Sequence, residues 1–88
     1  MERDVVIRNS LGVHARPAAM FVQIASRFKA KILVERDGVE VNGKSIMGVL
    51  MLAAERGARL TLRADGGDAH DALAALAELV EVRMFDET

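Results

Sequence analysis

The feature that most constrains the fold is a pair of short apolar segments separated by Asp37-Gly38. An Asp-Gly pair between two such segments is typical of a tight β-hairpin turn, because glycine adopts the positive φ of that turn without steric cost. In the second segment, two valines alternate with polar residues, as in a half-buried strand. The sequence therefore predicts paired strands at Ile32–Arg36 and Val39–Asn42.

The rest of the chain is predicted to form short strands and amphipathic helices. Val5–Ile7 is a β-branched run, and Arg59–Arg63 alternates so regularly that one face of the sheet should contact water. Helical spacing of apolar residues predicts helices at Ala15–Phe28 and Ile46–Leu52. A last helix follows Gly66-Gly67-Asp68, a predicted turn and cap, and has its apolar residues at the same spacing: Ala72, Leu73, Leu76, Leu79 and Val80. The order β-α-β-β-α-β-α predicts an α+β fold, a two-layer sandwich with amphipathic helices over one face of a sheet.

Charge and composition exclude several classes of function. The 88 residues have 12 Lys+Arg and 13 Asp+Glu, a balance that argues against nucleic-acid binding, and three Phe without Trp or Tyr offer no base-stacking platform. The absence of cysteine excludes disulfides and thiolate metal sites, and two histidines distant in sequence do not suggest zinc. We predict no metal and no cofactor, and we expect His70 to be a solvated surface residue.

Nothing in the sequence suggests a membrane protein or a second domain. The longest apolar run, Ile46–Ala54, is shorter than the about 20 residues that span a bilayer. The charged start of the chain does not resemble a signal peptide. We expect residues 1–88 to form one domain of a cytoplasmic protein without direct membrane insertion.

The hexapeptide Gly12–Pro17 contains the first candidate functional residues, His14 and Arg16. A helix N-terminus presents unpaired N–H groups and the positive end of the helix dipole, which favour a phosphate. Two basic side chains there oppose the dipole unless an anion is bound. Imidazole is nucleophilic near neutral pH, and a guanidinium group suits phosphate oxygens. We predict that His14 accepts a phosphoryl group and that Arg16 stabilises its charge during transfer.

Ser45 is the second candidate. It precedes the predicted helix Ile46–Leu52, where its hydroxyl would serve as an N-cap, and a phosphate at that position would also be favourable. Gly38–Ser45 matches the nucleotide-binding pattern Gly-x-x-x-x-Gly-Lys-Ser. That interpretation is rejected, because the intervening residues alternate like a strand and Glu40 would repel phosphate.

Exposed apolar residues near both sites suggest partner docking. A helix of about two turns that is apolar nearly all round cannot bury every side chain. We expect Val49 and Leu52 in the core, and Met20, Met47 and Leu50 at a docking surface, since exposed methionines adapt to several partners.

Two segments resemble the signatures of a known family, the histidine-containing phosphocarrier protein HPr of the bacterial phosphoenolpyruvate-dependent phosphotransferase system. Gly12–Ala18 is similar to the active-site signature, and Lys44–Leu50 is similar to the serine-site signature. The separation of the segments, the chain length and the order of elements also match. The resemblance implies an open-faced sandwich, a four-stranded antiparallel sheet with three helices on one face.

The resemblance also implies roles for individual residues. His14 would receive the phosphoryl group on Nδ1 from phosphorylated Enzyme I and pass it to Enzyme IIA domains, with assistance from Arg16. Ser45 would be modified by HPr kinase/phosphorylase, which would reduce transfer from Enzyme I. The implied docking surface contains four residues: Met20, Ile46, Met47 and Leu50. The protein would be a carrier without independent catalytic activity, and we expect a monomer because transfer needs an open face.

Two alternatives stay open. A nitrogen-related branch of the family also keeps the histidine and often ends in acidic residues, as Phe85-Asp86-Glu87 does here, although that branch tends to depart from Lys-Ser-Ile-Met-Gly. The other alternative is a protein-binding regulator switched at Ser45. In this alternative His14 would be vestigial; membership of a regulatory paralogue that lacks the histidine is disfavoured, because this chain keeps His14.

Overall fold

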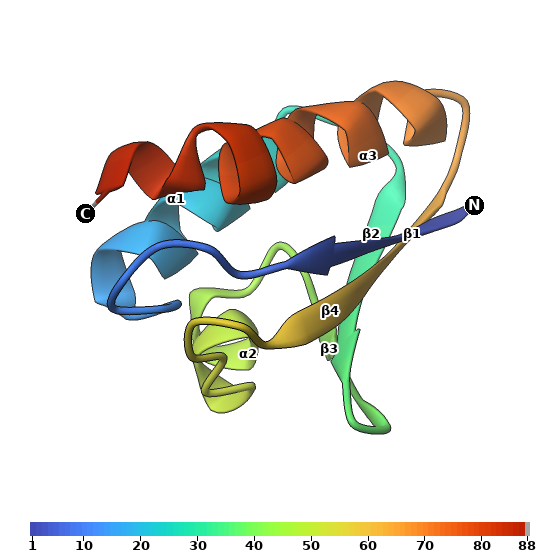
Figure 1. Ribbon diagram of the computed structural model, residues 1–88. Helices are drawn as coiled ribbons and strands as arrows, with labels where there is room; N and C mark the ends of the chain where they lie inside the picture. The colour runs from blue at the N-terminus through green and yellow to red at the C-terminus, as the bar shows by residue number, and fades with distance from the viewer. Residues whose placement is uncertain (88) are drawn as a thin grey trace.

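The computed structural model describes residues 1–87 and contains a four-stranded antiparallel sheet with helices on one side (Figure 1). The strands are β1 (Glu2–Val6), β2 (Lys31–Arg36), β3 (Val39–Asn42) and β4 (Arg59–Asp65), in the order β1-β4-β2-β3. The helices are α1 (Ala15–Ala25), α2 (Ile46–Met51) and α3 (Ala69–Ala77). The predicted α+β sandwich and its order of elements are confirmed. No helix within residues 1–87 is long and apolar enough to cross a membrane.

The central hairpin forms as predicted. Asp37 and Gly38 have φ values of +50° and +84°, and the strands they join pair from Arg36 with Val39 onward. Both turn residues therefore occupy the left-handed region that a two-residue hairpin needs.

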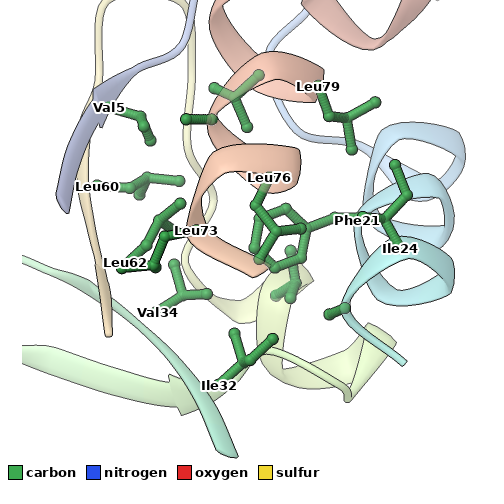
Figure 2. Packing of buried hydrophobic residues seen from close by; sticks show 14 of the residues in the cluster. Val5, Phe21, Ile24, Ile32, Val34, Leu60, Leu62, Leu73, Leu76 and Leu79 are labelled. Atoms are coloured by element: carbon green, nitrogen blue, oxygen red, sulfur yellow. The ribbon is translucent and has the colours of Figure 1, made fainter. Parts of the chain in front are cut away.

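The core lies between the sheet and the helices, and its side chains come from both layers (Figure 2). Figure 2 shows sheet residues facing the helices: Val5, Ile32, Val34, Leu60 and Leu62. The helical side contributes Phe21, Ile24, Leu73, Leu76 and Leu79. Val49 and Leu52 are 3% and 6% exposed, so both core predictions are confirmed.

The other face of the sheet is polar, as the alternation in β4 predicted. Arg63 of β4 forms ion pairs with Glu2 of β1, Glu35 of β2 and Glu40 of β3. One arginine thus links all four strands on the face that no helix covers.

Several element ends differ from the predictions, and α1 is the clearest case. This helix ends at Ala25 rather than Phe28, because the N–H groups of Arg27 and Phe28 donate to carbonyls three residues back, at 3.0 and 3.2 Å. The Nζ of Lys44 donates to the carbonyl of Phe28 at 2.7 Å. The end of the predicted helix is therefore a tightened turn held by a side chain from elsewhere.

The predicted position of Asp68 before the last helix is confirmed, since it is the N-cap residue of α3, but a capping bond from its side chain is absent. Its carboxylate instead accepts hydrogen bonds from the N–H groups of Lys29 and Ala30, both at 2.9 Å. Asp68 therefore fixes the start of α3 against the turn that follows α1.

Strand and helix ends shift elsewhere by a few residues. β1 spans Glu2–Val6 instead of Val5–Ile7, and β4 continues to Asp65, because backbone pairing extends through charged residues that an apolar pattern does not mark. α2 ends at Met51 rather than Leu52. After α3, a π-helical turn (Glu78–Val82) and a segment with positive φ at Met84, Phe85 and Asp86 (Met84–Glu87) complete the described chain.

Candidate functional site

The segment before α1 is held by hydrogen bonds within itself and by a hydrogen bond to the turn after α2. The N–H of Gly12 donates to the carbonyl of Asn9 at 3.2 Å, and the Nδ2 of Asn9 donates to the carbonyl of Gly12 at 2.7 Å. The N–H of Val13 donates to the carbonyl of Ala54 at 2.8 Å. Gly12 has a φ of +71°, and a Cβ atom at this position would lie 2.4 Å from the Ala54 oxygen. Only glycine fits this close approach.

His14 is the N-cap residue of α1. Its backbone is extended (φ −104°, ψ −165°), its carbonyl accepts from the N–H of Ala18 at 2.9 Å, and its half-buried side chain makes no capping bond to the helix. Within an α-helix the amides of Ala15 and Arg16 have no carbonyl four residues back to bond, and Pro17 has no N–H. The first turn contains no acidic residue, so no side chain of that turn offsets the helix dipole.

Arg16 is exposed beside His14 in the chain, and an acidic residue from the C-terminal segment lies within its electrostatic reach. The pKa of Asp86 is lowered chiefly by a hydrogen bond from Arg83, at 2.9 Å, and further by the positive charges of Arg83 and Arg16. Figure 1 shows the C-terminal end near the start of α1. The position of this acidic end could not be predicted from the sequence, because no local pattern connects it with Arg16.

Ser45 is the N-cap of α2, as predicted. Its Oγ accepts a hydrogen bond from the N–H of Gly48 at 3.0 Å. The turn that follows α2 is held by Arg36, whose Nη1 donates to the carbonyls of Leu52 and Ala53 at 3.0 and 2.8 Å. The same turn contains Ala54, the residue that accepts from Val13. The structure thus connects the His14 segment to one end of α2, while Ser45 begins the other end.

The predicted docking residues differ in exposure. Met47 is 71% exposed and Ile46 is 43% exposed, whereas Met20 and Leu50 are half-buried against the core. Met51, at 72% exposure, was not predicted. It lies one helical turn after Met47, so helical spacing from Met47 could have identified it.

His70 lies at the surface: 81% of its side-chain surface is accessible to solvent. Among the side chains that the structure describes, no group of three or more His, Cys, Asp or Glu could hold a metal ion.

Comparison with known proteins agrees with this arrangement. The family model described as the PTS HPr component phosphorylation site matches residues 1–82. The chain belongs to the HPr family of the phosphotransferase system. The HPr phosphocarrier protein of Xylella fastidiosa is 44% identical, covering 100% of this chain and 99% of the relative. The crystal structure of HPr from Thermoanaerobacter tengcongensis superimposes with a TM-score of 0.94 at 45% identity, covering 100% of this chain and 98% of that one.

The HPr family consists of carrier proteins of the phosphotransferase system rather than catalysts. It also includes relatives with another name: the HPr-like protein Crh of Halalkalibacterium halodurans is 44% identical, covering 92% of this chain and 96% of its own. HPr of T. tengcongensis has in addition been crystallised as a dimer, so the expectation of a monomer stays a prediction.

Proposed function

We propose that this protein accepts a phosphoryl group on Nδ1 of His14 from phosphorylated Enzyme I and passes it to Enzyme IIA domains. The observation that carries the proposal is the position of His14 as N-cap of α1, beside first-turn amides and with no acidic residue in that turn. We propose further that residues 1–88 act as one domain, a cytoplasmic monomer that needs no cofactor and has no catalytic activity of its own.

Transfer to His14 forms one bond and breaks one. The lone pair of the imidazole nitrogen forms a bond to phosphorus, while the bond between phosphorus and the donor atom of Enzyme I breaks and leaves its electron pair on the donor. The guanidinium group of Arg16 and the amides of Ala15 and Arg16 stabilise the charge on the phosphoryl oxygens. The same steps in reverse deliver the group to the acceptor.

Phosphorylation with Enzyme I and phosphoenolpyruvate tests the proposal directly. We expect one acid-labile phosphoryl group per chain, detected by intact mass and by 31P NMR. His14→Ala should abolish the label, and His70→Ala, the matched control at the other histidine, should retain it. Label that persists in His14→Ala would exclude the assignment.

The role of Arg16 has its own test. Arg16→Ala should slow transfer by about 10²-fold, as the loss of one oxyanion-stabilising donor does in other sites. Arg27→Ala removes an exposed arginine near the other end of α1 and should leave the rate unchanged. Equal rates in the two variants would remove Arg16 from the transfer site.

We propose Ser45 as a regulatory phosphorylation site. Its hydroxyl already accepts from the helix amide of Gly48, so a phosphate at this place would meet favourable N–H groups. HPr kinase/phosphorylase with ATP should add an acid-stable phosphate that Ser45→Ala loses and Ser26→Ala keeps. The phosphorylated protein should accept the His14 label from Enzyme I more slowly. An unmodified Ser45 would remove this part of the proposal.

The choice between sugar uptake and the nitrogen-related branch depends on the acceptor. Transfer from the phosphorylated protein to Enzyme IIA domains of each kind, compared by rate, distinguishes them. The alternative of a Ser45-switched regulator predicts no histidine label, together with a partner that binds only the Ser45 phosphate. Light scattering during size-exclusion chromatography tests the monomer.

A further inference from the structure

Asn9 is the only buried polar residue among residues 1–86, for which the structure describes burial, and it lies in the segment that leads to His14. Its side chain is fully inaccessible to solvent. Burying a carboxamide is unfavourable unless its polar atoms are hydrogen-bonded. A residue of this kind inside an apolar environment therefore needs a specific explanation.

The carboxamide of Asn9 has one satisfied side and one unsatisfied side. Its Nδ2 donates to the carbonyl of Gly12 at 2.7 Å, while its Oδ1 has no hydrogen-bond partner among the described residues. An apolar side chain would avoid the unsatisfied oxygen, but it could not donate to Gly12. The bond to Gly12 is thus the gain that sets Asn9 apart from an apolar residue.

This bond restrains the two residues that precede His14. The carbonyl of Gly12 is held by Asn9, its N–H is held by the backbone of Asn9, and its Cα faces the backbone of Ala54 without room for a Cβ. The N–H of Val13 is held by Ala54. These three backbone groups before His14 are therefore fixed either by the Asn9 turn or by the turn after α2.

We infer that the side chain of Asn9 is a positioning residue for His14, acting through Gly12 in the phosphoryl transfer proposed above. In-line transfer depends on the position of the nucleophile, and misplacement by about 1 Å lowers rates by about 10²-fold. Asn9 sets that position from a buried site without touching the phosphoryl group.

The first test compares Asn9→Ala with Val34→Ala, a truncation in the sheet core that also lowers stability but lies on β2. At a temperature where both variants are folded, Asn9→Ala should transfer from Enzyme I about 10-fold to 100-fold more slowly than Val34→Ala. The loss should fall on kcat rather than KM, because α2 and its exposed residues are unchanged. Equal transfer rates in the two variants would overturn the inference.

A second variant covers the case in which Asn9→Ala does not fold. Asn9→Leu fills similar space and removes the unsatisfied Oδ1, but it leaves the Gly12 carbonyl without its side-chain donor, so we expect it to lose less stability than Asn9→Ala. Its transfer should still be slow. Transfer at the unmodified rate by Asn9→Leu would show that Asn9 only fills space.

NMR of the His14 ring supplies a readout independent of Enzyme I. The ring signals should change in Asn9→Leu and stay unchanged in Val34→Ala; unchanged signals in both would contradict the inference. If the unmodified protein takes no label from Enzyme I, the proposed function fails. If it takes the label and both Asn9 variants match it, only the role of Asn9 fails.

Discussion

The N–H of Val13 donates to the carbonyl of Ala54 at 2.8 Å, and this bond joins the segment before α1 to the turn after α2. Ala54 is 3% exposed, and its turn is held by Arg36 from the central hairpin. The two regions that contain His14 and Ser45 are therefore attached to one framework. Backbone changes at this contact should affect the His14 segment first.

Gly12→Ala tests this contact. Alanine at position 12 would have to adopt the left-handed φ of +71°, and its Cβ would lie 2.4 Å from the Ala54 oxygen. We therefore expect the free energy of unfolding, measured with urea, to fall by about 3 kcal/mol. Gly38→Ala is the matched control, with a φ of +84° but no atom within 4 Å. It should lose only about 1 kcal/mol, the conformational cost alone. Equal losses would show that the approach to Ala54 is not restrictive.

The sequence predicted those parts of the fold that local chemistry determines. The turn at Asp37-Gly38 needs positive φ, and the cap at Ser45 needs a short side-chain acceptor, so both could be recognised from neighbouring residues. His14 was recognised in the same way, from its position at a helix start. Each of these depends on contacts within a few residues along the chain.

Contacts between distant segments were not predictable from such patterns. Asp68 was expected to cap its own helix, yet its carboxylate bonds to Lys29 and Ala30, which only the folded chain brings close. The position of Asp86 within reach of Arg16 and the burial of Asn9 depend in the same way on tertiary packing. A single sequence contains no periodicity that reports such pairs.

Met47→Ala tests the docking surface on α2. Met47 is 71% exposed, so its truncation should change the free energy of unfolding by less than about 0.5 kcal/mol. If the residue is an anchor for Enzyme I, the KM for transfer should rise about 10-fold while kcat stays unchanged. Val82→Ala, at 75% exposure in the C-terminal π-helical turn, is the control and should alter neither. An unchanged KM in Met47→Ala would remove this residue from the docking surface.

The hydrogen bonds to the Asp68 carboxylate should make part of the free energy of unfolding depend on pH in the acidic range. The pKa of this carboxylate is lowered mainly by the hydrogen bond from the N–H of Lys29, and also by that from Ala30 and the charge of Lys44. Because the folded state favours the carboxylate, this contribution is complete above the ordinary aspartate pKa of about 3.9 and is lost as pH falls through the lowered value. Urea unfolding between about pH 7 and pH 2 should show a smaller pH-dependent loss in Asp68→Asn than in the unmodified protein.

The difference between the two proteins should disappear at the acid end of that range. Asp71→Asn removes a carboxylate from the first turn of α3 that is 81% exposed, and so separates a general effect of charge at this helix start from the bonds made by Asp68. Identical pH profiles for Asp68→Asn and the unmodified protein would contradict the assignment.

Phe85 extends the core beyond the residues that the family model matches. The match ends at residue 82, but Phe85 is 1% exposed in a segment with positive φ at Met84, Phe85 and Asp86. The buried ring holds this strained segment, and with it the ion pair between Arg83 and Asp86 at 2.9 Å. Phe85→Ala should therefore lower the free energy of unfolding by about 3 kcal/mol, as measured by urea denaturation. Val82→Ala, close in sequence but exposed, should change it by less than about 0.5 kcal/mol. If the two variants are equally stable, the C-terminal segment contributes nothing to the fold, and Asp86 is not held near Arg16 by this packing.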